Sequence, residues 1–159
     1  MYSTAIRKSR AFSLIELVIV VVIIGIIAAI AIPRMSRGAS GANDGALSSN
    51  LAALRKAIDL YAAEHNNTFP TVADFAPLLT GYSNEGGTKS PDGTQAGGHI
   101  FGPYIRSIPV QTVGPKKGSS GVAVADGASV GWLYNATTGV ITANVTGQTD
   151  ANGKTYITY

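Results

Sequence analysis

The sequence predicts an α+β protein, in which a long N-terminal helix, transmembrane in its first half, packs on a small antiparallel β-sheet. Three patterns carry this prediction. Residues 12–33 are almost uninterruptedly apolar, and apolar residues recur at helical spacing over residues 47–61. Towards the C-terminus, short runs of strand-forming residues alternate with turn-forming ones. We therefore expect a leader at 1–11, a transmembrane helix at 12–33, its amphipathic extension at 34–66, and a C-terminal globular part with a loop and the sheet at 67–159.

Composition and charge exclude several classes of function. The chain of 159 residues has 12 Lys and Arg against 9 Asp and Glu. Three of the basic residues, Arg7, Lys8 and Arg10, precede Phe12, so the remainder is formally neutral. This removes the general electrostatic argument for nucleic-acid binding. The absence of cysteine excludes a disulfide framework, a thiolate zinc site and a cysteine nucleophile.

The apolar run has the length of a membrane span. Residues 12–32 would extend over about 31 Å as an α-helix, close to the ~30 Å of a hydrocarbon core. The basic residues ahead of it favour a cytoplasmic N-terminus. Glu16 is the one carboxylate in the run. A charge at membrane depth costs about 3 kcal/mol, so Glu16 is expected to have a partner, unless it lies solvated at headgroup level.

Three interpretations of this segment compete. It is a plain transmembrane anchor, or a secretory signal peptide cut after Ala29-Ile30-Ala31, which fits a small-residue cleavage pattern. The third interpretation places the cut between Ala11 and Phe12, so that the apolar run stays on the mature protein. The signal-peptide interpretation needs an unusually long apolar region and leaves Glu16 without a purpose.

The order of features over roughly residues 7–35 resembles the N-terminus of type IV pilins and type II secretion pseudopilins. A basic leader, a small residue, Phe12, Glu16 at the fifth mature position, a long apolar helix and Pro33 follow one another. The resemblance implies cleavage between Ala11 and Phe12 by a prepilin peptidase and N-methylation of Phe12. Ala11 stands where the family usually has glycine. The resemblance also implies that Glu16 pairs with the Phe12 amine of a neighbouring subunit and sets the axial register of a filament.

Small residues and a proline shape the rest of this helix. Gly25 and Ala29 form a small-xxx-small pair that allows close helix approach, although small residues are also frequent in membrane helices. Pro33 lacks an N–H and is expected to kink or fray the helix. The glycines that follow cost about 1 kcal/mol each in a helix interior, which predicts a weak joint; they are Gly38, Gly41 and Gly45.

The following segments are expected to build the globular part. One apolar stripe predicts a helix that ends at Asn66 and Asn67; its members are Leu47, Leu51, Leu54, Ile58 and Tyr61. Thr71 and Asp74 resemble a capping box for a short helix, and residues 81–99 form a long polar loop. The expected strands lie at 122–124, on both sides of the turn 136–139, and at 154–159, and Trp132 and Tyr134 are assigned to the core.

Other motifs carry less chemistry. Residues 127–131 match G-x-S-x-G, but a hydrolase elbow needs a strand–turn–helix context, and strand-forming residues follow here. His65 and His99 are too few for a metal cluster and are expected to be solvated. Asp150 and Asn152 have the spacing of half a calcium loop without its distal glutamate. Calcium is thus a weak candidate cofactor, and a plain turn is favoured.

The interpretation favoured by these observations is a structural subunit, not an enzyme, that forms a homo-oligomeric helical filament. Residues 102–109 are similar to a pseudopilin segment, which together with the missing cysteines favours type II secretion. The alternatives are a type IV pilus subunit for adhesion, motility or DNA uptake, and an exported soluble binding module. The expected partners are the prepilin peptidase, an inner-membrane assembly platform, other pseudopilins or pilins, and the membrane, but not nucleic acid. The expected location is the bacterial inner membrane, single-pass with a periplasmic C-terminal domain, and then a filament in the periplasm or at the cell surface.

Overall fold

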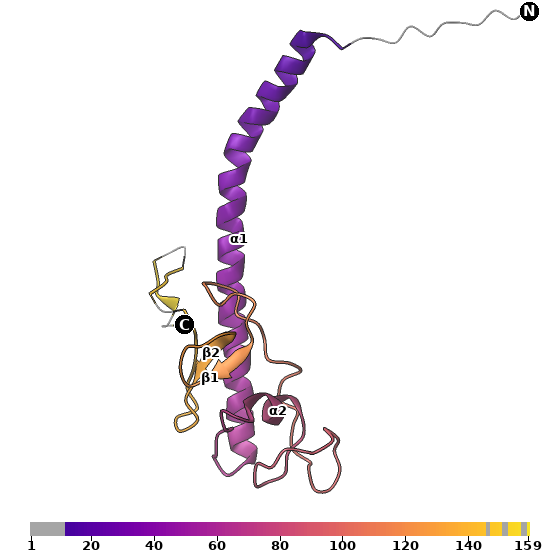
Figure 1. The fold of residues 1–159 in the computed structure, drawn as a ribbon, viewed down its shortest axis with the longest axis vertical. Helices are drawn as coiled ribbons and strands as arrows, with labels where there is room; N and C mark the ends of the chain where they lie inside the picture. The colour runs from indigo at the N-terminus through magenta and orange to yellow at the C-terminus, as the bar shows by residue number, and fades with distance from the viewer. Residues whose placement is uncertain (1–11, 146, 151–152, 157–158) are drawn as a thin grey trace, which may run out of the picture. The chain divides into compact units, whose positions relative to one another are not determined.

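The computed structural model describes residues 12–145, 147–150, 153–156 and 159, and it divides into two compact units, Met1–Ala39 and Ser40–Tyr159. Helix α1 (Leu14–Glu64) begins in the first unit and ends in the second (Figure 1). In the described part of the first unit, this helix accounts for every residue after Ser13. The unit therefore holds the apolar run as a helix, as predicted.

The second unit adds one short helix and a small sheet to the end of α1. The elements are α2 (Phe75–Thr80), β1 (Gly121–Ala123), β2 (Val130–Tyr134) and β3 (Ile141–Ala143). Strands β2 and β3 pair antiparallel, with Trp132 opposite Ala143 and Tyr134 opposite Ile141. The α+β fold, with a long apolar helix and a small sheet, is therefore confirmed, and so is the hairpin around residues 136–139.

The sheet is mixed, whereas the sequence predicted an antiparallel one. Strand β1 pairs parallel with β2, with Val122 beside Trp132 and Ala123 beside Leu133. A parallel pair ordinarily needs a long crossover because the chain must return along the full strand. Here β1 spans only three residues, about 10 Å, so the six-residue connection can cover the return. The segment just before β1 lies close to β2 at Gly131, where a Cβ would overlap the Ser119 carbonyl oxygen.

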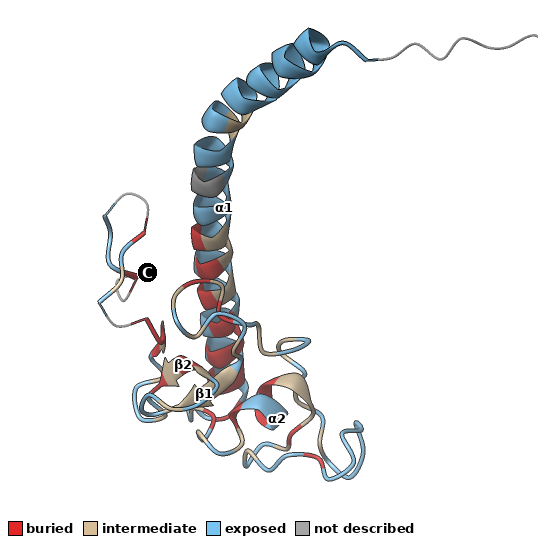
Figure 2. Ribbon diagram, turned by 45° about the horizontal axis from the view of Figure 1, so that its top comes forward, coloured by how far each residue is buried: buried red, intermediate tan, exposed pale blue. Residues whose placement is uncertain are grey.

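The core lies between the second part of α1 and the inner face of the sheet. All five members of the predicted stripe are at most 2% exposed, and they line one side of the helix (Figure 2). Trp132, Tyr134 and Ile141 meet them from the sheet, so the assignment of both aromatic residues to the core is confirmed. Trp132 Nε1 donates to Pro109 O at 2.8 Å and Tyr134 Oη to Pro70 O at 3.0 Å. Each such side chain contributes about 1.5–3 kcal/mol by its burial.

The predicted end of the long helix agrees with the structure, and the predicted start of the short helix does not. Helix α1 ends at Glu64, and Asn66 and Asn67 follow with φ of 52° and 59°, the left-handed region that asparagine tolerates. The Asn67 N–H donates to Ala62 O at 2.8 Å, which satisfies a carbonyl of the last turn. Before α2, Thr71 Oγ1 accepts the Asp74 N–H at 3.2 Å. This bond lies in the turn before the helix and does not cap it, because α2 begins only at Phe75 with Asp74 as its N-cap and without a side-chain capping bond.

The loop and the C-terminal segment have little regular structure. Within residues 81–109, the described pairing is limited to isolated bridges of Ser83 with Lys89 and with Phe101. In the described part of the strand predicted at 154–159, Thr155 forms only an isolated bridge with Thr149. Residues 157 and 158 lie outside the described residues.

Long-range hydrogen bonds join the C-terminal segment to α1. Tyr156 Oη donates to an Asp44 carboxylate oxygen, and Arg55 Nη2 donates to Tyr159 O at 2.6 Å. The same guanidinium nitrogen lies 3.4 Å from Ile141 O. The side chain of Arg55 is exposed, yet it bonds both the C-terminal segment and the edge strand β3.

Candidate functional site

The first turn of α1 contains Glu16, the one carboxylate within the apolar run. The helix begins at Leu14, so Ser13 is its N-cap and Glu16 its third residue. Glu16 Oε2 accepts the Ser13 backbone N–H at 2.9 Å, and the Leu17 N–H donates to Ser13 O at 3.2 Å. This is the glutamate half of a capping box, in which the third residue of the helix reaches back to the N-cap.

The capping bond gives Glu16 a role inside its own subunit. Its carboxylate satisfies one N–H at the start of the helix, and its negative charge lies at the positive end of the helix dipole. The sequence carried this signal, because Ser13-Leu14-Ile15-Glu16 has the S-x-x-E spacing of a capping box. The capping role of Glu16 was not predicted, because only the cost of its charge in the apolar run had been considered.

Phe12 lies immediately before this cap and outside the helix. Its side chain is 78% exposed. Ala11, on the other side of the expected cleavage bond, lies outside the described residues. The carboxylate of Glu16 is therefore fixed close in sequence to the residue that a cut after Ala11 would make the new N-terminus.

The apolar part of α1 is exposed on all its faces within the first unit. Its large side chains from Leu14 to Ile32 are between 42% and 80% exposed, with Val18 the least and Leu14 the most. Among the described residues, α1 is the one helix long and apolar enough to cross a membrane. Large apolar side chains on every face are typical of a membrane helix, since a helix of a soluble core has one apolar stripe.

The small residues and the proline of this segment lie within the continuous helix. A Cβ placed on Gly25 would meet no atom within 4 Å, and Ala29 is exposed one turn further along. Pro33 was expected to kink or fray the helix. It lies inside α1 and does not end it, and α1 also continues through Gly38, Gly41 and Gly45.

Of the two histidines, the prediction for His65 is wrong. His65 is 2% exposed and stacks on Tyr61 with ring centroids 3.9 Å apart. Its Nδ1 lies 2.8 Å from Tyr61 O and its Nε2 3.0 Å from Ser83 Oγ. The fold of residues 81–101 over the end of α1 buries it, and the helical pattern alone does not reveal this. His99 is half-buried, with Nδ1 2.8 Å from Ala96 O.

The weak calcium candidate is engaged in a turn. Asp150 Oδ1 accepts the Lys154 N–H at 2.8 Å, and its Oδ2 accepts the Tyr159 hydroxyl at 2.6 Å. Asn152 lies outside the described residues. No group of three or more His, Cys, Asp or Glu residues that could hold a metal occurs in the part of the chain that the structure describes. Both Asp150 oxygens thus already accept hydrogen bonds from the protein.

The G-x-S-x-G match falls in a turn that leads into a strand. Ser129 is exposed with φ of 60°, and β2 begins at the next residue. A hydrolase elbow requires a helix after the serine. The chain has a strand at that place, so this segment lacks the context that the chemistry needs.

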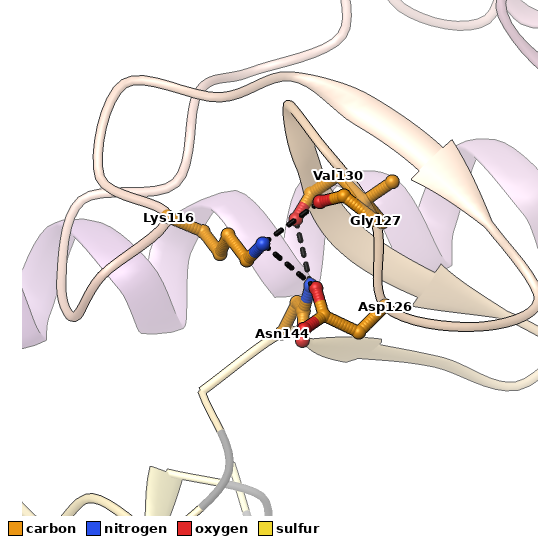
Figure 3. A network of polar contacts seen from close by, with 5 residues as sticks. All are labelled: Lys116, Asp126, Gly127, Val130 and Asn144. Atoms are coloured by element: carbon orange, nitrogen blue, oxygen red, sulfur yellow. Dashed lines mark hydrogen bonds and ion pairs between the residues drawn. The ribbon is translucent and has the colours of Figure 1, made fainter.

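The same turn is held by a polar network (Figure 3). Lys116 Nζ lies 2.8 Å from Asp126 Oδ1 and donates to Gly127 O at 2.8 Å. Asn144 Nδ2 donates to Asp126 Oδ1 at 2.7 Å and to Val130 O at 2.8 Å. The pKa of the Asp126 carboxyl is lowered, mainly by the hydrogen bond from Lys116 and to a smaller extent by the one from Asn144. The network fixes the β1–β2 turn against the end of β3, which is a structural role.

The comparisons with known proteins bear on the N-terminal segment. The model of the prokaryotic N-terminal methylation motif matches residues 6–32. No curated protein and no solved structure matches the chain. The matched motif implies processing by a prepilin peptidase and a structural rather than enzymatic role. The apolar helix is consistent with a single-pass membrane anchor. The methylation motif and the apolar helix are together consistent with a type IV pilin-like filament subunit, and the motif covers only the N-terminal segment of the chain.

Proposed function

We propose that this chain is a type II secretion pseudopilin that polymerises from the bacterial inner membrane to drive protein export. The observation that carries the proposal is the first part of α1, whose apolar side chains are exposed on all faces while one carboxylate lies in its first turn. Nothing in the described first unit covers this surface. Lipid covers it in the single subunit, and the apolar helices of neighbouring subunits replace the lipid in a filament.

Cleavage between Ala11 and Phe12 creates the positive partner for Glu16. The new N-terminal amine, also after N-methylation, is positively charged at neutral pH. In the single subunit the Ser13 N–H already satisfies one oxygen of Glu16, which holds the carboxylate at the start of the helix. We propose that this oriented carboxylate pairs with the Phe12 amine of the neighbouring subunit. Two opposite charges attract more strongly at low dielectric than in water, so this pair sets the axial register.

The small residues then serve the packing of helices in the filament. The open space at Gly25, with Ala29 one turn away, lets a neighbouring helix approach closely. Pro33 and the glycines after it weaken the helix by about 1 kcal/mol or more per residue. We propose that this part of α1 loosens when subunits pack, which would let the periplasmic domain adjust its position.

A mass measurement tests the processing step. Intact-protein mass spectrometry of the membrane fraction should give a mature chain that lacks residues 1–11 and carries one additional methyl group. A chain that begins at Ile32 would instead identify the apolar run as a removed signal peptide. That result would favour an exported binding module.

Two substitutions at Glu16 separate its charge from its cap. Glu16→Gln keeps an oxygen that can accept the Ser13 N–H but removes the charge, and Glu16→Val removes both. We expect both variants to insert in the membrane and to yield at least tenfold less sheared filament, because each lacks the pairing charge. Normal filament yield from Glu16→Gln would eliminate the charge pair and leave the capping bond as the role of Glu16.

Deletion of the gene distinguishes the two machines. A type II secretion subunit predicts that folded enzymes accumulate in the periplasm while surface filaments persist. A type IV pilus subunit, the alternative, predicts loss of surface filaments with unchanged enzyme secretion. The lack of cysteine and the segment 102–109 support the first outcome.

A further inference from the structure

The far end of the apolar segment carries two positive charges that the proposed filament contacts do not use. Between residues 17 and 43 the charged residues are Arg34 and Arg37, and both belong to α1 within the first unit. Positions three apart on an α-helix are neighbours on one face. The side chain of Arg34 is exposed. The exposed side chain of Arg34 therefore places positive charge directly after Pro33, and Arg37 is a second basic residue one turn further along the sequence of α1.

The length of the helix sets the depth of this charge in a membrane. Twenty residues separate the helix start at Leu14 from its charged end, about 30 Å at ~1.5 Å per residue. This equals the ~30 Å thickness of a hydrocarbon core. When the first turn with Glu16 lies at one surface of the core, Arg34 lies at the headgroup layer of the other surface.

The first unit contains no acid that could neutralise this charge. Its carboxylate is Glu16, which is 18 positions, about 27 Å, from Arg34 along the helix. No Asp or Glu occurs within four positions of either arginine, so helical ion pairs cannot form. A guanidinium carries a positive charge and can form paired hydrogen bonds with phosphate oxygens.

We propose that Arg34 and Arg37 bind the phosphates of anionic phospholipids at the C-terminal end of the membrane span. This inference rests on the proposed function, since it concerns the subunit while it is anchored in the membrane. The contacts fix the depth of α1 in the bilayer. They are released when the subunit leaves the membrane, so the lipid binding opposes its extraction into a filament.

The lipid preference of the full chain, processed and reconstituted in vesicles, tests this proposal. Phosphatidylcholine vesicles are doped with spin-labelled phosphatidylglycerol or with spin-labelled phosphatidylcholine, and the association of each label with the protein is measured by electron paramagnetic resonance. We expect a preference of about fivefold for phosphatidylglycerol per arginine. The preference should disappear in Arg34→Gln/Arg37→Gln. It should largely persist in Arg34→Lys/Arg37→Lys, which keeps the charges.

A matched control removes the same charge elsewhere. Arg106 and Lys117 are exposed in the second unit, and Arg106→Gln/Lys117→Gln should retain the wild-type preference. Equal association of both lipids with the wild type would overturn the inference, and so would an equal loss of preference in the control. Whether carbonate extracts the protein from the vesicles is measured in parallel. A wild-type chain that is extracted refutes the membrane anchor of the proposed function, whereas a retained chain without lipid preference refutes the arginine site alone.

Discussion

Two parts of one helix differ in where their apolar side chains lie. In residues 14–39 of α1 they point in all directions and are exposed, and in residues 40–64 those of the stripe are buried against the sheet. The backbone is helical throughout, so the difference lies in the side chains alone. An all-round apolar surface suits a helix surrounded by lipid or by other helices, and a single stripe suits a helix on a core. Exposed apolar area would be unfavourable along the stripe of residues 40–64, whereas in residues 14–39 it suits the membrane and filament contacts that we propose.

The largest expected effect comes from one truncation in each part of the helix. Leu54 is 0% exposed, and Leu54→Ala should lower the free energy of unfolding by about 2–5 kcal/mol because it leaves a cavity in the core. Ile23 is 51% exposed, and Ile23→Ala should change this free energy by less than about 0.5 kcal/mol. Urea titration of the full chain in detergent micelles, followed by the emission of Trp132, measures both. Equal changes in the free energy of unfolding of the two variants would contradict the difference between the two parts of α1.

A second prediction concerns the core of the second unit, and here the substitution is expected to increase the free energy of unfolding. Gln111 is fully buried, and neither of its side-chain amide atoms has a hydrogen-bond partner among the described residues. Gln111→Met should stabilise the protein by about 1–2 kcal/mol, since an unpaired buried polar group costs about 1–3 kcal/mol. The neighbouring Thr112 is the control, because its hydroxyl donates to Asn43 O at 2.8 Å. Thr112→Val should therefore destabilise by about 1 kcal/mol in the same titration, and stabilisation by both would contradict the argument.

The smallest effect is expected from removing the hydroxyl of a core tyrosine. Tyr134→Phe removes the bond to Pro70 O and should cost about 1 kcal/mol at neutral pH. Burial raises the pKa of Tyr134 from its ordinary 10 to about 12. The stability that this burial of the neutral phenol contributes is complete below pH 10 and is lost as the pH rises towards 12, because the unfolded tyrosine ionises first. Unfolding midpoints at pH 7, 10 and 12 should show a shallower alkaline loss in Tyr134→Phe, and parallel curves would exclude this contribution.

The candidate site was only partly visible in the sequence. A single carboxylate in an apolar run identified Glu16, because a charge at that place is costly. Its bond to the Ser13 N–H was also encoded locally, in the S-x-x-E spacing of a capping box, and was not predicted. The pairing that we propose with Phe12 of another subunit would involve a second chain, so neither one sequence nor the structure of one chain contains it.

Some elements could be predicted because neighbouring residues alone specify them. The periodicity of the stripe specified which side of α1 is buried, and the tolerance of Asn66 and Asn67 for positive φ specified where it ends. The hairpin follows equally from its turn, in which Asn135 Oδ1 accepts the Thr137 N–H at 2.9 Å. All these signals act within a few residues.

The contacts between distant segments could not be predicted, because they form through tertiary packing. The parallel pairing of β1, the burial of His65 under residues 81–101, and the bond between Tyr156 and Asp44, 112 positions apart, depend on which surfaces meet after the chain has collapsed. A local pattern specifies that a side chain can be buried or can form a hydrogen bond. It does not specify the partner, because the partner is selected by the packing of the whole unit.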